Sequence, residues 1–155
     1  MISTWVQAGG IGLRLWSWGP EQGRPVVLLH GFLDQGLADD EPAAPNLVIL
    51  FADDLGNVYV TGSFRGTVDF GGGPRLSAGE SDICLIKLDS AGNLLWDRNY
   101  GNVGKASGND LVWDGSGNIW LTGSFEDAID FGGGPLVSSG ERDVFLAKFT
   151  ASFGV

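Results

Sequence analysis

Short runs of apolar residues, with polar residues at alternate positions, recur along most of the chain. These runs are rich in β-branched and aromatic side chains and are bounded by Gly, Asn and Asp, and no long window shows the 3.6-residue period of a helix. The pattern predicts an all-β fold with antiparallel sheets. The predicted strands are 12–18, 25–30, 47–53, 57–64, 82–89, 93–100, 110–114, 118–125, 129–131 and 143–149, with a minor extended segment at 67–70.

A tandem repeat is the strongest internal signal. Shifting the chain by 61 residues aligns residues 50–88 with 111–149 without a gap, and 20 of the 39 aligned pairs are identical. Most of the other pairs exchange similar side chains, as Val58 does with Ile119. Because the predicted strands fall at equivalent places, each copy is expected to form one four-stranded β-unit, and the second copy ends before its fourth main strand.

Three connections share the pattern Asp-x-x-Gly-Asn, in which Asp caps a hairpin turn and Gly takes the positive φ that closes it. They begin at Asp53, Asp89 and Asp114. Carboxylates are also calcium ligands, so these three residues are weak metal candidates, but the loops lack the further oxygen ligands and the distal Glu of an EF-hand. We therefore expect turn chemistry and no cofactor, with weak calcium binding as the alternative.

Each copy also contains the segment Asp-Phe-Gly-Gly-Gly-Pro, at 69–74 and at 130–135. A phosphate-binding loop would need a following helix and a Lys-Ser/Thr pair, whereas Pro and a polar stretch follow here. We predict wide β-turns, beside which Phe70 and Phe131 pack inward.

The strings GNVYVTGSFRGTVDFGGG and SAGESDICLIKLDSAGNLLWDRNYG resemble the SBBP-type β-propeller repeat of bacterial extracytoplasmic proteins. The resemblance covers about residues 47–149. It implies tandem four-stranded propeller-like blades, fewer than two of them complete, with a binding or structural role, no catalytic residues and an extracytoplasmic location. Because a closed propeller needs about four to eight blades, either chains assemble into a homo-oligomer through open sheet edges or those edges stay exposed.

Residues 11–37 differ from the repeat, and their VVLLHGF segment resembles the opening of an α/β-hydrolase. The resemblance would place His30 and Gly31 in the oxyanion-hole loop, with Asp34 as a nearby carboxylate. However, no Gly-x-Ser-x-Gly motif occurs and His30 is the single histidine, so a Ser-His-acid triad cannot be built. We therefore interpret this stretch as a fragment that contributes strands rather than catalysis.

A composition break separates these two parts. The predicted units are a hydrolase-like segment at 1–37, an acidic, Pro/Ala-rich linker at 38–46, a first repeat at 47–109 and an incomplete second repeat at 110–155. Two unlike family signatures in one chain are typical of a chimeric or truncated product. The aromatic alternation of residues 12–18 also suggests the hypothesis that this strand pairs beside 143–149 to complete the second unit.

Charge and composition narrow the function classes. With 9 basic and 19 acidic residues the formal net charge is −10, which disfavours nucleic acid as a partner. No signal peptide is seen and no apolar run approaches the roughly 20 residues of a membrane-spanning helix, so we expect a soluble protein without membrane insertion, and the compartment stays open. The single cysteine, Cys84, aligns with Phe145, which marks a core position.

The favoured function is therefore a non-enzymatic β-propeller-repeat scaffold or binding module with a protein or glycan ligand. Tyr59, Trp113 and Trp120 are candidates for an aromatic binding surface, although aromatic residues in β proteins are more often core. One alternative is a degenerate or truncated esterase-like hydrolase that uses His30, Gly31 and Asp34. A calcium-binding repeat protein that uses Asp53, Asp89 and Asp114 is the other.

Overall fold

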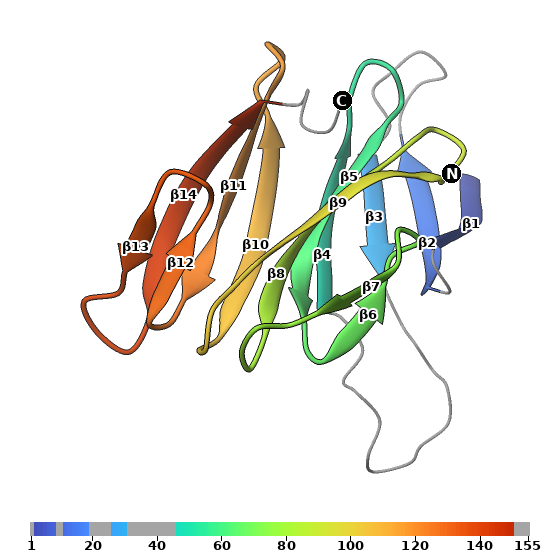
Figure 1. Cartoon of the computed structure of the whole chain (residues 1–155). Coiled ribbons are helices and arrows are strands. Elements are labelled where there is room, and N and C mark those ends of the chain that lie inside the picture. The colour runs from blue at the N-terminus through green and yellow to red at the C-terminus, as the bar shows by residue number, and fades with distance from the viewer. Residues whose placement is uncertain (1, 9–10, 19–25, 31–45, 151–155) are drawn as a thin grey trace.

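The structure, a computed structural model, describes residues 2–8, 11–18, 26–30 and 46–150, and describes side chains over 51–150 (Figure 1). All elements in the described part are β-strands, and all strand pairs are antiparallel. No helix long and apolar enough to cross a membrane occurs among these residues. The predicted all-β, antiparallel fold is confirmed. The strands are β1 (Ile2–Ala8), β2 (Ile11–Trp18), β3 (Val26–His30), β4 (Asn46–Ala52), β5 (Val58–Phe64), β6 (Thr67–Asp69), β7 (Pro74–Leu76), β8 (Asp82–Leu88), β9 (Leu94–Tyr100), β10 (Ala106–Trp113), β11 (Asn118–Phe125), β12 (Ala128–Asp130), β13 (Pro135–Val137) and β14 (Asp143–Thr150).

The two copies of the repeat form two sheets with the same strand order. Sheet 1 has the order β4-β5-β8-β9, and sheet 2 has the order β10-β11-β14. A two-stranded ribbon is inserted between equivalent strands of each sheet: β6-β7 in sheet 1 and β12-β13 in sheet 2. Within the described residues, sheet 2 therefore repeats sheet 1 without its fourth strand.

The ribbons and the start of β10 differ from the prediction. The segments expected at 67–70 and 129–131 are one strand of each ribbon, and their partners β7 and β13 were missed because each is short and begins with Pro. Strand β10 begins at Ala106 rather than at 110, because a bulge between Gly108 and Asp110 interrupts the alternation that the pattern relies on. The predicted boundary at 109/110 thus lies inside β10.

The N-terminal segment forms its own sheet, in the order β1-β2-β3, with β3 beside β4 (Figure 1). The strands expected at 12–18 and 25–30 are β2 and β3, whereas β1 was not predicted. The hypothesis that 12–18 pairs beside 143–149 is wrong. Both edges of β2 are occupied, by β1 and β3, and within the described chain β14 pairs with β11 alone.

Alternation along the strands gives each sheet two faces, which we name face A and face B. Face A of sheet 1 contains Val60, Phe64, Cys84, Ile86 and Leu88, and face B contains Tyr59, Ile83, Leu85 and Trp96. Face A of sheet 2 contains the equivalents of the first set, among them Leu121, Phe125, Phe145 and Phe149, and its face B contains Val112, Trp120, Val144 and Leu146.

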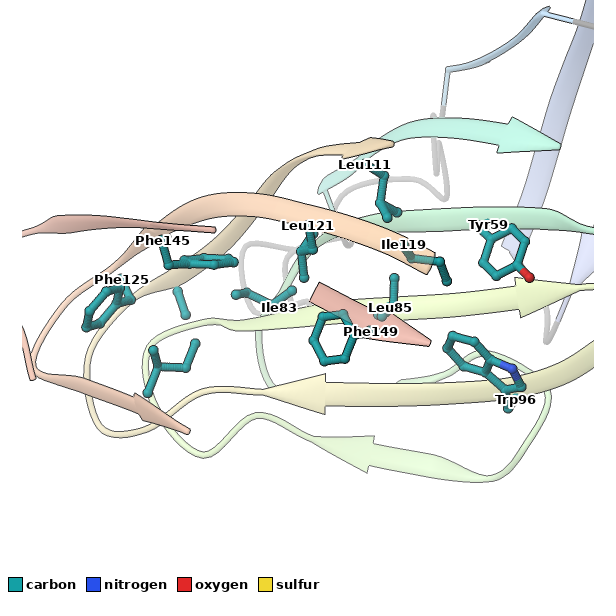
Figure 2. Close-up of a cluster of buried hydrophobic side chains, with 12 residues drawn as sticks. Tyr59, Ile83, Leu85, Trp96, Leu111, Ile119, Leu121, Phe125, Phe145 and Phe149 are labelled. Carbon is teal, nitrogen blue, oxygen red and sulfur yellow. The ribbon is translucent and has the colours of Figure 1, made fainter. Parts of the chain in front are cut away.

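The largest core joins face B of sheet 1 to face A of sheet 2 (Figure 2). Ile83 and Leu121, one from each sheet, are both 0% exposed. Rings also meet across the sheets, since the Tyr100 and Phe149 centroids lie 5.6 Å apart in a stacked arrangement. Each apolar side chain removed from water in this way contributes roughly 1.5–3 kcal/mol, so this interface dominates the packing.

A glycine lets the sheets approach closely. A Cβ placed on Gly108 in β10 would lie 2.2 Å from Oγ1 of Thr61 in β5, which is less than any van der Waals contact. Only a residue without a side chain fits at this position. The polar segment at the start of β10, which sequence analysis did not predict as a strand, therefore allows sheet 2 to pack on sheet 1.

Leu85 and Leu146 occupy the same repeat position in opposite settings, 1% and 66% exposed. Truncating a buried leucine leaves a cavity, so we expect Leu85→Ala to lower the free energy of unfolding by about 2–5 kcal/mol and Leu146→Ala by less than about 1 kcal/mol. Urea unfolding followed by tryptophan fluorescence measures both values. Equal losses would contradict the burial of face B in sheet 1.

Candidate functional site

The three Asp-x-x-Gly-Asn segments are capped hairpin turns, as predicted. In the first, Oδ1 of Asp53 accepts hydrogen bonds from the backbone N–H groups of Leu55 (3.0 Å) and Asn57 (2.9 Å), and Oδ2 accepts from the side-chain amide of Asn57 (2.9 Å). The turns at Asp89 and Asp114 have the same three bonds. These turns hold the hairpins at one end of the two sheets.

The metal candidates Asp53, Asp89 and Asp114 sit in separate turns, after β4, β8 and β10. Within the described residues, no group of three or more His, Cys, Asp or Glu side chains is arranged to hold a metal ion. Calcium binding at these positions stays a prediction, and it would compete with the hydrogen bonds that close the turns.

Asp53 has a more elaborate environment than its two equivalents. The Tyr59 hydroxyl donates to its Oδ2 (3.2 Å), and Lys87 Nζ lies 4.0 Å from the same oxygen and 5.0 Å from the Tyr59 ring centroid. Burial alone would raise the pKa of Asp53, but the hydrogen bonds from Asn57, Leu55 and Tyr59 stabilise the carboxylate and bring the pKa below its ordinary value. Burial, and then the Asp53 charge, raise the pKa of Tyr59. Asp53, Tyr59 and Lys87 therefore form a structural group, in which the Asp53 carboxylate caps the turn and the Tyr59 phenol is buried beside it.

The structure describes only some of the residues singled out for chemistry. His30 is the last residue of β3, and Gly31 and Asp34 lie outside the described residues. Cys84 is 0% exposed on face A of sheet 1, where burial raises the pKa of its thiol to about 12, so the predicted core role is confirmed. Of the three candidate aromatics, Tyr59 is fully buried and Trp113 packs against the same core, so only Trp120 lies outside it.

The glycine triplets form turns at the tips of the ribbons. Oδ1 of Asp69 accepts from the N–H groups of Gly71 (2.7 Å) and Gly73 (3.0 Å), and Asp130 makes the equivalent bonds in the second copy. Phe70 is 3% exposed, and the half-buried Phe131 ring lies 4.7 Å from the ring of Phe145. Both the turn prediction and the inward packing are confirmed.

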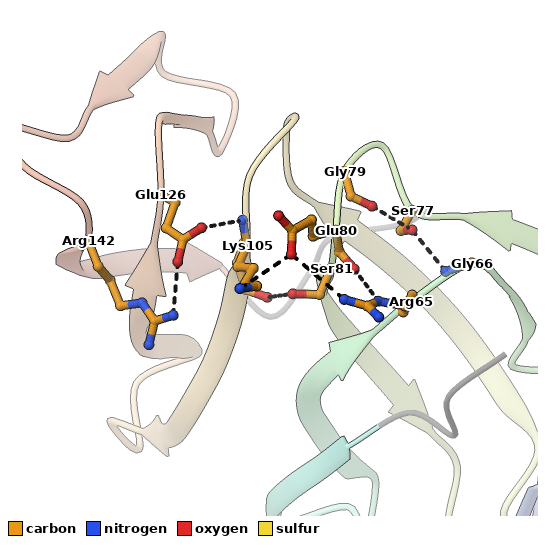
Figure 3. Close-up of polar contacts among 10 residues, drawn as sticks. Arg65, Gly66, Ser77, Gly79, Glu80, Ser81, Lys105, Glu126 and Arg142 are labelled. Carbon is orange, nitrogen blue, oxygen red and sulfur yellow. Dashed lines mark hydrogen bonds and ion pairs between the residues drawn. The ribbon is translucent and has the colours of Figure 1, made fainter. Parts of the chain in front are cut away.

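The best candidate for a functional surface is a row of charged side chains at the opposite end of the sheets from the Asp turns (Figure 3). We call this the loop end, and it comprises residues 65–66, 77–81, 101–105, 126–127 and 138–142. Backbone bonds join its loops across the repeats: Ala106 N–H donates to the Ser81 carbonyl (2.9 Å), and Glu126 N–H donates to the Lys105 carbonyl (2.8 Å). The loops thus have defined positions.

Charges of alternating sign follow one another along the loop end. Glu80 Oε2 lies 3.7 Å from Arg65 Nη2 and 3.3 Å from Lys105 Nζ, and Glu126 Oε1 lies 2.9 Å from Arg142 Nη2. The side chains of Arg65, Glu80, Lys105 and Arg142 are 48–59% exposed. Pairs this exposed contribute little to stability, at most about 1 kcal/mol each, so the charges remain free to contact another molecule.

The two copies differ in charge at this end while sharing the loop geometry. Arg65 and Glu126 occupy the same repeat position with opposite charge, and each pairs with a residue of the loop before β8 or β14. Serines at positions 77 and 138 make equivalent bonds to the Gly79 and Gly140 carbonyls. The sequence signal for this row was the exchange of charge between aligned positions, which our prediction did not use. Its exposed donors and acceptors suit recognition of a partner.

Comparisons with known proteins give a partial relative and no family. No protein-family model matches the chain. An alignment over 73 residues, which covers 44% of the chain, shows 40% identity to part of the regulatory protein FlaEY of Caulobacter vibrioides. The match spans only 7% of the length of that relative. The class of the protein is therefore defined by its fold, which is all-β and built of two stacked tandem repeats.

Replacing Asp53 by Asn tests the electrostatic role of the turn cap. The folded-state pKa of Asp53 is below its ordinary value of 3.8, so its contribution to stability is fully present above that value and is lost as pH falls through the lowered folded pKa. As pH falls below about 4, we expect the urea midpoint of the wild type to fall more steeply than that of Asp53→Asn. Glu141→Gln, which removes an exposed charge outside the turn, is the control, and identical slopes for wild type and Asp53→Asn would contradict the assignment.

Proposed function

We propose that the chain is a non-enzymatic β-repeat scaffold, with sheets stacked as propeller-like blades, that presents its loop end to a protein or glycan partner. The observation that supports this most is the contact between face B of sheet 1 and face A of sheet 2. A contact between equivalent units of a tandem repeat is the construction principle of stacked-repeat proteins. The resemblance to SBBP-type repeats, and with it an extracytoplasmic location, fits the same proposal.

Two buried acidic residues, Asp82 and Asp97, support a structural role. Asp82 is 1% exposed and accepts from the Ala78 N–H (3.1 Å) and from the Asn99 side chain (3.1 Å). Asp97 is 3% exposed and pairs with Arg75 through two nitrogens of the guanidinium. Groups held in this way order loops and strands, whereas a catalytic acid or base must face a substrate.

The N-terminal segment and the partial relative agree with this proposal. We propose that β2 and β3 supply strands for packing in a chimeric chain, because the His30 segment has no second histidine to complete a triad. FlaEY is described as a regulatory protein, which suits a recognition module better than a hydrolase. The chain covers too little of that protein for its whole activity to apply here.

Hydrolysis of p-nitrophenyl butyrate separates the scaffold from the hydrolase alternative. We expect the wild type and His30→Ala to give the same rate, equal to the buffer background, because a lone histidine without a nucleophile provides no acyl-transfer route. The measurement is absorbance of released nitrophenol at matched protein concentration. Turnover that is lost in His30→Ala would reverse the conclusion in favour of the hydrolase.

Binding of the labelled chain to a glycan microarray tests the role of the loop end. We expect substitution of Lys105 and Arg142 by Ser to weaken any glycan binding by roughly tenfold, which corresponds to about 1.4 kcal/mol of lost contacts. Lys148→Ser is the matched control, because Lys148 lies on face B of sheet 2, away from the loop end. A loss in the control that equals the loss in the loop-end variant would place the ligand elsewhere. Absence of glycan binding would restrict the proposal to protein partners.

A further inference from the structure

Face B of sheet 2 is an exposed apolar surface. Val112, Val144 and Leu146 are 55%, 83% and 66% exposed. The strand registers place all three on this face, since Val112 pairs with Trp120, Leu146 with Thr122 and Val144 with Ser124. Val144 and Leu146 are neighbours on one face of β14, and Val112 lies on the same face of the sheet, two strands away on β10. Exposed aliphatic side chains gathered on one face of a sheet are a typical sign of an interaction site.

The same face is covered in sheet 1. The repeat equivalents of Val144 and Leu146 are Ile83 and Leu85, and these are 0% and 1% exposed. Their cover is face A of sheet 2, which contributes Leu121, Phe145 and Phe149 to the shared core. One repeat position is therefore buried in the first copy and open in the second, and the structure shows what type of surface covers it.

An aromatic pair repeats this relation. In sheet 1, Lys87 lies over the ring of Tyr59 (5.0 Å). Among the rings that pack against Tyr59, that of Trp113 comes from sheet 2, with centroids 6.3 Å apart. In sheet 2, Lys148 lies over the ring of Trp120 (5.1 Å), which is the residue equivalent to Tyr59. Within the described residues, Trp120 therefore has a lysine over its ring, as Tyr59 does, but no ring from a following sheet covers it.

The edge of sheet 2 is open as well. Strand β8 of sheet 1 pairs with β5 on one side and β9 on the other. Its equivalent β14 pairs with β11, and within the described chain its second edge has no strand. A strand at this edge would complete the order seen in sheet 1. The open edge and the open face lie where a following unit would attach.

We propose that face B of sheet 2, together with the edge of β14, is the docking surface for a third β-repeat of the same class, which packs on sheet 2 as sheet 2 packs on sheet 1. A strand equivalent to β9, leading into this repeat, would pair with β14. Face A of the third repeat, with Leu and Phe at the positions of Leu121, Phe145 and Phe149, would cover Val144 and Leu146. This inference rests on the proposed repeat scaffold.

A second copy of this chain is a poorer occupant. The face A residues of sheet 1, such as Val60 and Cys84, are 1% and 0% exposed, and face A of sheet 2 is buried against sheet 1. Of the faces of sheets 1 and 2, a second copy would therefore offer only its own exposed face B of sheet 2. Two chains that each carry a net charge of −10 also repel one another.

The experiment compares the chain with an extended chain in which residues 90–150 are repeated after Thr150, so that the 61-residue offset is kept. Val144→Asp is placed in both. In the original chain Val144 is exposed, so we expect the unfolding equilibrium constant to rise by no more than about fivefold. In the extended chain the new carboxylate would be buried, and we expect a rise of about a hundredfold or more.

Val137→Asp is the matched control, because Val137 is 71% exposed in β13, outside face B. This substitution should raise the unfolding equilibrium constant by no more than about fivefold in both chains. Hydrogen exchange gives a second measurement: the amides on the open edge of β14 should become protected in the extended chain.

Three results would overturn the proposal. The first is that the β14 amides remain unprotected from exchange in the extended chain. The second is that Val144→Asp has an equal effect in both chains. The third is that the original chain forms a homodimer that Val144→Asp dissociates, because this would assign the face to a second copy. The proposed scaffold fails differently, through equal effects of Leu85→Ala and Leu146→Ala in the original chain.

Discussion

Burial of face B of sheet 1 under face A of sheet 2 is the interaction on which the rest of the described structure depends. A lone two-stranded hairpin is marginal in water, and a sheet of three or more strands becomes stable when it buries an apolar face. The shared core, which runs from Tyr59 and Trp96 to Phe125 and Phe149, removes face B of sheet 1 and face A of sheet 2 from solvent at the same time. This contact positions the loops of one sheet relative to those of the other.

The two ends of the sheets use polar residues for different purposes. At one end, Asp53, Asp89 and Asp114 close their hairpins by bonding within each turn. At the loop end, charged side chains pair between loops and between repeats, as Glu80 does with Lys105. The hydrogen bonds of the Asp turns are made within a few residues of the chain. The charges of the loop end are exposed, and their sign differs between the two copies. A surface that varies on a constant frame is the usual place for recognition.

Sequence analysis predicted the local features well and the relations between sheets poorly. The hairpins follow from Asp, Gly and Asn at fixed spacing, and the main strands follow from alternation, because both are encoded within a few residues. The start of β10 could not be predicted, since its polar Ser-Gly-Asn-Asp segment suits close approach to Thr61 only once sheet 1 is present. The pairing proposed for residues 12–18 failed because a likeness to β9 says nothing about which edge is free. The loop end was missed for a similar reason, because its charges are distant in sequence.

The most direct test of the central contact is a double-mutant cycle between Gly108 and Thr61, which face each other across the two sheets. Gly108→Ala forces a Cβ against Oγ1 of Thr61, and Thr61→Ala removes that oxygen. If sheet 2 packs on face B of sheet 1, the double variant should lose less stability than the sum of the single losses, by about 1 kcal/mol or more. Additive losses would mean that the two strands do not meet, and would contradict the stacked arrangement.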